Sequence, residues 1–313
     1  MKTRWIIHPI FNRTVLGNIS HSIHKLEQNY PEAIPSLEKS QSIFLFSDYG
    51  GEHKDSMYNV YSFMITEESS VGLFIHRTKL LRSKSIRDNR RFSFKKLSDK
   101  IRLNALNDFL LSADDIEGIL LTFAIRKNIE LFAESRSDNY LTQKLSKEKR
   151  NVEMKIITIA HLAAYVVTSL VRQGQDVMWI TDDDAISSNN ETLCLLTNVF
   201  ANIIGNIINF HLGHIRCGCS RSDPGDNQLE DLLAIPDFAA GVVSEQFSKY
   251  QSDPYAFFIT APVMSEKMQR LSWWFSDNRG KLKRYLAVID DHDEKPRSSF
   301  FHFFDGPLKE CAW

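Results

Sequence analysis

Cysteine is scarce in this chain, and so is net charge of either sign. The 313 residues include only four cysteines, Cys194, Cys217, Cys219 and Cys311, which are too few for a disulfide framework. The 38 basic and 39 acidic residues leave a formal charge of −1, so any binding to nucleic acid has to come from local patches. We therefore predict a globular protein of the reducing cytoplasm.

The sequence also lacks a long hydrophobic run. Its opening, MKTRWIIHPIFNRT, is basic but has no apolar stretch of signal-peptide length. The most apolar segment, residues 156–171, is shorter than a membrane span and contains His161 and Thr168. We expect neither export nor insertion into a membrane. No phosphate-binding loop, dinucleotide fingerprint or internal repeat is visible in the sequence either.

The most informative stretch that is present is SIFLFSDYGGEHKDSMYNVYSFMIT, residues 42–66. Both ends are rich in Ile, Phe, Val and Tyr, and Gly50 and Gly51 lie between them, so the pattern predicts two strands joined by a turn. Asp48 falls at the end of the first strand. Because a buried charge is costly without a partner, we expect a basic side chain or a metal ion beside this carboxylate.

Helical and extended patterns follow one another through the rest of the chain. Helices are predicted at residues 67–81, 99–111, 138–173, 191–212, 229–250 and 265–275, and strands at 118–125, 176–181, 213–217, 283–289 and 299–304. Ser98 is the expected cap of the second helix and Gly174 the expected end of the third. This order predicts an α/β protein with a mixed sheet flanked by helices. Residues 1–41 form a lead-in, 42–253 the main domain and 254–313 an extension packed on it.

Acidic residues follow or interrupt these apolar elements at three places. Asp48 ends the first strand, Asp182, Asp183 and Asp184 end a later one, and Asp237 lies among small apolar residues of a helix. Ligands bind at the carboxyl ends of strands in such sheets, and clustered carboxylates select hard ions such as Mg²⁺ or Mn²⁺. Asp183 is set aside because alternation sends it to the opposite face. The predicted metal ligands and catalytic residues are Asp48, Asp182, Asp184 and Asp237.

A paired-ion site of this kind activates water and stabilises the leaving oxygen in phosphodiester cleavage. The most basic part of the sequence, RSKSIRDNRRFSFKKLSDK at residues 82–100, suits the same substrate. In it Arg90, Arg91, Lys95 and Lys96 are the candidates for contacts with nucleic-acid phosphates. A solvated loop explains the same charge run equally well. The acidic cluster nevertheless predicts a nuclease, with DNA or RNA as its undecided partner.

The stretches that contain these aspartates resemble segments of a known protein family. The stretch FLFSDYGGEHKDSMYNVYSFMI resembles the opening hairpin of RNase H-like (retroviral-integrase-type) proteins of a large bacterial family of unknown function, whose first strand typically ends in Asp-Glu-Ser-Gly. VMWITDDDAI is similar to the family's central acidic strand, and LLAIPDFAAGVVSE to its late helix. The resemblance spans residues 42–250. It implies an RNase H-like domain at 42–253 with a divalent-metal-dependent nuclease site at the four aspartates.

The sequence departs from the family's pattern at two places. Tyr49, Gly50 and Gly51 stand where the family has Glu-Ser-Gly, and FSFKKL keeps Lys95 and Lys96 without an acid before them. Loss of one ligand would weaken metal binding. The sequence therefore leaves open a non-catalytic binding or assembly module with a degenerate site.

Each aspartate also has a purely structural explanation. Asp48 can cap the following turn by accepting a hydrogen bond from one of its glycine amides. The Asp182, Asp183 and Asp184 run can precede a helix, whose N-terminus it favours. Asp237 follows a proline and can be an acid in the first turn of a helix.

A third hypothesis is a zinc-stabilised interaction protein. His211, His214, Cys217 and Cys219 offer four zinc-type donors in HLGHIRCGC. Their spacing is not that of a standard finger, and the flanking pattern suits a helix end that passes into a strand. The apolar end of the chain at Trp313 could cover a partner, so a homo-oligomer or a protein partner stays open.

Overall fold

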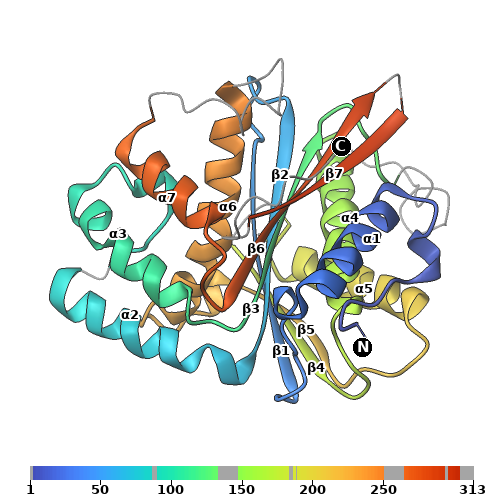
Figure 1. The fold of residues 1–313 in the computed structure, drawn as a ribbon, viewed down its shortest axis with the longest axis horizontal. Helices are drawn as coiled ribbons and strands as arrows, with labels where there is room; N and C mark the ends of the chain where they lie inside the picture. Colours follow the sequence, from blue (N-terminus) through green and yellow to red (C-terminus); the bar gives the residue numbers. More distant parts are fainter. Residues whose placement is uncertain are drawn as a thin grey trace.

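One mixed sheet runs through the structure, a computed structural model that describes residues 3–86, 90–132, 147–182, 186–187, 189–249, 264–292 and 295–303. Its strands lie in the order β5-β4-β1-β2-β3-β6-β7 (Figure 1). The strands are β1 Ser42–Gly50, β2 Tyr58–Glu67, β3 Gly118–Arg126, β4 Asp176–Thr181, β5 Ile215–Cys219, β6 Leu282–His292 and β7 Lys295–His302. The helices are α1 Val15–Asn29, α2 Gly72–Ser85, α3 Lys100–Ala113, α4 Lys147–Thr168, α5 Asn190–Ile207, α6 Gln228–Lys249 and α7 Glu266–Ser276.

The sheet has an antiparallel centre that is continued on both sides by parallel strands. β1 pairs antiparallel with β2, and β2 with β3. On one side β4 joins β1 and β5 joins β4, both in parallel. These parallel steps require long crossovers, in which α4 precedes β4 and α5 precedes β5. On the other side β6 runs parallel to β3 and β7 returns antiparallel to β6.

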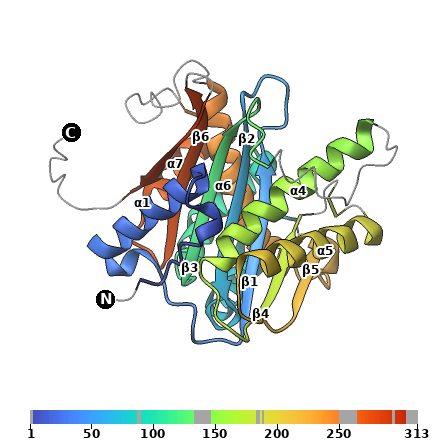
Figure 2. The same ribbon diagram turned by 90° about the vertical axis from the view of Figure 1, so that its right-hand side faces the viewer.

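Helices cover both faces of the sheet. In Figure 1 the sheet is seen nearly edge-on, with α1, α4 and α5 on one side and α2, α3, α6 and α7 on the other. Figure 2 looks onto the layer of α1, α4 and α5. Successive side chains along a strand therefore pack into different cores. Leu45 packs in the core under α4, and Phe46 packs in the core under α6. Both cores are apolar because each strand is buried on both faces.

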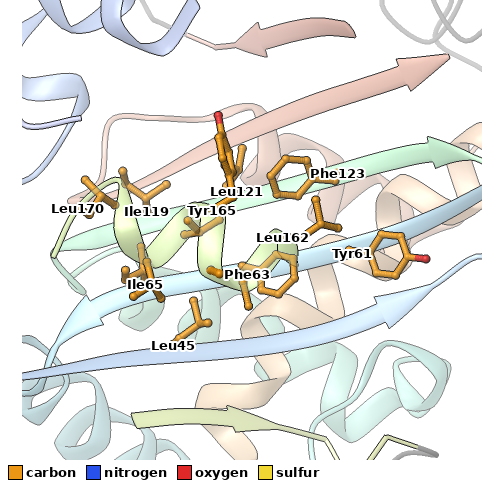
Figure 3. Close-up of a cluster of buried hydrophobic side chains, with 14 of the residues drawn as sticks. Leu45, Tyr61, Phe63, Ile65, Ile119, Leu121, Phe123, Leu162, Tyr165 and Leu170 are labelled. Carbon is orange, nitrogen blue, oxygen red and sulfur yellow. The ribbon is translucent and has the colours of Figure 1, made fainter. Parts of the chain in front are cut away.

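The core under α4 is rich in aromatic rings. Tyr165 of α4 lies against the sheet in Figure 3, and its ring is 6.1 Å from that of Phe123 on β3. The Tyr165 hydroxyl hydrogen bonds to Ser20 of α1 at 2.8 Å. A buried phenol needs such a partner. This bond ties α1, in the N-terminal lead-in, to α4.

The α/β architecture with a mixed sheet flanked by helices is confirmed. The hairpin predicted at residues 42–66 is present as β1 and β2, and the strand predicted at 176–181 is β4. The turn of the hairpin uses Gly51 at φ +78°, where a Cβ would lie 2.1 Å from a backbone oxygen. Only glycine fits that backbone. The predicted pair of strands near the C-terminus is also present, and it extends the sheet as β6 and β7.

The boundaries of several helices differ from those predicted. Helix α2 starts at Gly72, since Glu67 belongs to β2 and its carboxylate accepts the Ser40 amide at 2.9 Å. Helix α3 is capped by Asp99, whose carboxylate accepts the amides of its first turn, and not by Ser98. A carboxylate at this position satisfies backbone N–H groups that have no partner within the helix.

Helix α4 ends at Thr168, well before Gly174. The hydroxyl groups of Thr168 and Ser169 donate to carbonyls one turn back, at 2.7 and 2.8 Å, and such bonds weaken a helix at its end. Gly174, at φ +84°, lies instead in the turn that leads into β4. Residues 138–146 of the predicted helix lie outside the described residues. Among the helices that are described, none has the length and apolar character needed to cross a bilayer.

Candidate functional site

Asp48 lies in β1, and Asp182 directly follows the neighbouring parallel strand β4. The last register pair between β1 and β4 is Ser47 with Thr181, so each aspartate comes one residue after that pair. Adjacent strands are about 4.8 Å apart. Asp48 is inside β1, opposite Ser62 of β2, and not at the end of the strand as predicted. The hairpin strands are longer than their most apolar part because the backbone pairing continues to Gly50.

Both side chains belong to the face of the sheet that α6 covers. Phe46 and Ile180, two residues before each aspartate, pack in the core under α6, and side chains two residues apart on a strand share a face. Helix α6 crosses the end of β1 closely. A Cβ on Gly50 would lie 3.1 Å from the Ala240 carbonyl oxygen of that helix.

Asp237 lies on α6, one turn before Ala240. Its position deep inside the helix Gln228–Lys249 excludes the early-turn explanation. The carboxylate accepts a hydrogen bond of 2.6 Å from the Phe94 backbone amide. Burial, together with the charge of Asp182, raises the pKa of Asp237 to about 6, although the Phe94 amide, Lys95 and Arg91 act to lower this pKa. Asp182 and Asp237 are therefore close enough to repel each other.

Arg91 supplies positive charge to this group of acids. Its Nη2 atom is 3.2 Å from Oδ1 of Asp182, and its guanidinium also forms an ion pair with Glu230 of α6. The Ser220 hydroxyl donates a 2.8 Å hydrogen bond to the same Asp182 oxygen. Burial raises the pKa of Glu230 and the neighbouring Arg91 lowers it. Arg91 thus bridges two carboxylates from different elements.

Glu230 is a member of the acidic group that the sequence argument missed. It lies two helical turns before Asp237 on α6, and residues seven apart share one face of a helix. That spacing was a signal available in the sequence. The partner of Glu230 was not, because Arg91 lies far away along the chain.

The segment that carries Arg91, residues 90–97, is called the basic arm here. Phe94 anchors it: its buried ring faces Gly241 of α6, where a Cβ would lie 2.2 Å from the nearest ring atom. The Lys267 ammonium lies 4.0 Å from the centre of the same ring. The absence of a side chain at Gly241 is what lets the arm reach α6.

The backbone of the basic arm is held by two arginines from neighbouring helices. Arg82 of α2 donates to the carbonyl of Arg90 at 3.1 Å, and Arg102 of α3 donates to that of Arg91 at 2.7 Å. The Arg90 side chain is paired with Asp99. The arm is thus docked on the protein by its backbone and by Phe94.

The predicted site residues have different outcomes. Asp48, Asp182 and Asp237 lie on one face of the sheet, while Asp184 falls outside the described residues. In the arm, the Arg90 and Arg91 side chains pair with the protein's own carboxylates, whereas Lys95 and Lys96 are exposed. Within the ranges that the structure describes, no three or more His, Cys, Asp and Glu side chains are grouped so that they could hold a metal ion.

A polar network supports the site from the opposite face of the sheet. Ser47 accepts a 2.8 Å hydrogen bond from the Trp179 indole and pairs with the Tyr49 hydroxyl at 2.7 Å. Tyr49 also reaches the Thr181 hydroxyl at 3.1 Å. These bonds join β1 to β4 next to the two aspartates. They fix the distance between the strands that carry Asp48 and Asp182.

The four zinc-type donors do not come together in the described structure. His214 is exposed and its Nδ1 atom lies 3.2 Å from Asp176. Cys217 packs against α5, where burial raises the pKa of its thiol to about 12. Cys219 is buried, and the cysteines described are free. The segment is a short edge strand, as its apolar pattern indicated.

No protein-family model matches this chain, and no curated protein is detectably similar to it.

Proposed function

We propose that residues 42–253 form an RNase H-like domain and that the chain acts as a divalent-metal-dependent nuclease. One observation carries the proposal: Asp48 of β1 and Asp182, which directly follows β4, belong to the face of the sheet that α6 covers, and α6 carries Asp237. The topology supports it as well, since an antiparallel run β3-β2-β1 is continued by parallel β4 and β5. The carboxyl ends of parallel strands are where open sheets bind ligands.

The chemistry of the donors, though not their present grouping in the described residues, would suit Mg²⁺ or Mn²⁺. Carboxylate oxygens are the ligands that these hard ions prefer, and Asp48, Asp182 and Asp237 would hold the ion, with Asp184 as the predicted fourth ligand. A bound ion would supply activated water and stabilisation of the leaving oxygen. A cation would also favour the ionised form of Asp237, whose pKa is raised by burial and, to a smaller extent, by the charge of Asp182.

The other residues of the site would act on the phosphodiester. Lys95 and Lys96 are exposed next to the acids, and their ammonium groups would attract the phosphates of DNA or RNA. With a pKa of about 6, Asp237 is ionised above neutral pH. Nuclease activity should therefore rise with pH between about 5 and 7, because protonated Asp237 cannot serve as a ligand.

A second candidate is a non-catalytic binding or assembly module, and the ion pairs of Arg91 favour it. A guanidinium that neutralises Asp182 and Glu230 stabilises the fold without a metal. On this hypothesis the protein would bind nucleic acid or a protein partner and leave phosphodiesters intact.

Separate measurements of metal binding and of nucleic-acid cleavage distinguish the nuclease from the non-catalytic module. Thermal melting with increasing Mn²⁺ should show a stabilisation that saturates, about 2.7 kcal/mol at a hundred times the dissociation constant. Asp237→Asn should lose this effect, and the matched control Asp108→Asn, on the exposed side of α3, should keep it.

Cleavage is then tested on labelled single- and double-stranded DNA and RNA with Mn²⁺. The nuclease proposal expects cleavage by the wild type and by Asp108→Asn, and none by Asp237→Asn. Binding of Mn²⁺ without cleavage of any substrate supports the second candidate, a non-catalytic binding or assembly module. If neither Mn²⁺ nor Mg²⁺ raises the melting temperature, the metal site is refuted.

A further inference from the structure

A cavity of about 580 Å³ lies where α7 ends and the chain turns into β6. It shares no lining residue with the acidic group on the sheet. Its walls come from the last turns of α7, the loop to β6 and the end of β7, and they include Trp273, Asp277, Asn278, Arg279, His302 and Phe303. Small-molecule sites are typically about 300 to 1,000 Å³ in volume. The cavity therefore has room for one small ligand.

Aromatic rings form one part of the cavity wall. Trp273 is 69% exposed, whereas the other tryptophans that the structure describes are buried. An indole left in water forgoes the large burial energy of its ring. Phe303 lies in the same wall, packed edge to face against Phe275 of α7 at 6.2 Å. Burial lowers the pKa of His302, so its ring is neutral at pH 7. Such a wall suits a flat aromatic ring.

The loop that forms the opposite wall, residues 277–281, is held in place by hydrogen bonds. The Asn278 side chain accepts from the Arg284 amide at 2.6 Å and donates to the Arg284 carbonyl at 2.9 Å. The Lys283 ammonium donates to the carbonyls of Asn278 and Gly280 at 3.0 and 2.9 Å. Because the loop is already ordered, a ligand would pay little for ordering it.

Positive charge predominates around this loop. Residues 277–284, DNRGKLKR, contain four basic residues and one acid. Arg279, in the cavity wall, is paired with Asp277. Arg284 is fully buried and pairs with Asp114 through Nη1, while its Nε and Nη2 atoms have no hydrogen-bond partner in the described structure. The surroundings of the cavity therefore favour an anionic group on the ligand.

We propose that this cavity binds a nucleotide, with the base stacked on Trp273 and the phosphate held by Arg279. Every base has a flat face that stacks on an aromatic side chain. A guanidinium carries five N–H donors and binds phosphate through parallel hydrogen bonds. The inference requires neither a metal ion nor cleavage. A base joined to a phosphate occurs both in a free nucleotide and in a single strand, and the test separates these two sources.

Ligand-observed NMR titrations with the four 5′-mononucleotides test the site in the full chain, with chelator present throughout. At least one nucleotide should bind and receive saturation from the protein mainly on its base protons. The matching nucleoside, which lacks the phosphate, should bind at least about threefold more weakly. Ribose 5-phosphate, which lacks the base, should bind at least about fivefold more weakly.

Variants of two exposed side chains then assign the contacts. Trp273→Leu keeps an apolar side chain without a ring and should weaken nucleotide binding at least about fivefold, whereas Trp273→Phe should stay within about threefold of the wild type. Arg279→Gln should bind the nucleotide and its nucleoside equally well. The control Ile10→Ala changes an apolar residue that is 57% exposed just before α1, and it should change nothing.

A short oligonucleotide of the preferred base separates the two sources of the ligand. Binding at least about tenfold tighter than that of the mononucleotide, and lost in Trp273→Leu, assigns the site to single strands. Equal affinities assign it to free nucleotides.

Two results would overturn the inference. The first is that no mononucleotide or oligonucleotide binds. The second is that Trp273→Leu binds both as tightly as the wild type, because the contact would then lie on another surface. Neither result bears on the proposed nuclease, since chelator removes the metal. Nucleotide binding through Trp273 by a protein that cleaves nothing supports this inference and ends the nuclease proposal.

Discussion

The replacement Asp237→Asn should make the protein more stable above neutral pH. Asp237 is a carboxylate within a helix, covered by the basic arm, and burial together with Asp182 raises its pKa from 3.8 to about 6. That rise corresponds to an upper limit of about 3 kcal/mol for the ionised form. Because the side chain keeps some exposure, we expect about 1 to 3 kcal/mol. Asparagine removes the charge and still offers an oxygen to the Phe94 amide.

The sign of the pH dependence follows from linkage. Between pH 3.8 and about 6 the folded state binds more protons at Asp237 than the unfolded state does, so the stability that this group contributes falls as the pH rises. It is fully present below pH 3.8 and lost above about pH 6. The advantage of Asp237→Asn should therefore be near zero at pH 4 and reach its full value by pH 7.5.

Urea denaturation of the metal-free protein at pH values from 4 to 8 measures this difference, with chelator present throughout. The control Asp108→Asn should give a difference from the wild type that changes little with pH. A constant advantage of Asp237→Asn across the range would mean that ionisation of Asp237 costs the fold nothing. A loss of stability at pH 7.5 would show that the carboxylate is paired favourably, and the reasoning from repulsion would then be wrong.

Three further variants or probes test the surroundings of the site. Ser47→Ala leaves a buried indole N–H without its acceptor and should cost about 1 to 3 kcal/mol in urea denaturation; a change below about 0.5 kcal/mol, the lower end for a single hydrogen bond, would refute the role of that network. Gly241→Ala places a methyl group against the Phe94 ring, so trypsin should cleave the basic arm faster than in the wild type, and equal rates would contradict the docking. At pH 8 a thiol reagent should label exposed Cys194 quickly and half-buried Cys217 slowly, because burial raises the pKa of the Cys217 thiol to about 12; equal rates would mean that the Cys217 thiol is accessible.

The sequence was most informative where one local pattern determines the structure. The apolar run that becomes β3 and the run DVMWIT that becomes β4 were predicted within a residue, because a strand buried on both faces has few alternatives. The hairpin was equally clear from its glycine pair. Helix ends were harder. Helix α4 stops at Thr168 through hydroxyl groups that bond back to the backbone, a choice that periodicity does not reveal.

The placement of the three described aspartates near one face of the sheet was easier to predict than the positive charge that neutralises them. Asp48, Asp182 and Asp237 could be named because each interrupts or follows an apolar element. Their present counter-charge could not, because the contact between Arg91 and Glu230 joins segments 139 residues apart. A contact of that kind depends on the docking of the basic arm on α6. Local sequence patterns carry no information about such docking.

The account depends above all on Asp48, Asp182 and Asp237 sharing one divalent ion. Anomalous diffraction from crystals of the protein soaked in Mn²⁺ tests this claim most directly. We predict an anomalous peak within about 2.3 Å of carboxylate oxygens from β1, the end of β4 and α6. A well-diffracting soaked crystal with no peak among these three carboxylates, at a concentration where Mn²⁺ binds elsewhere, would contradict the account.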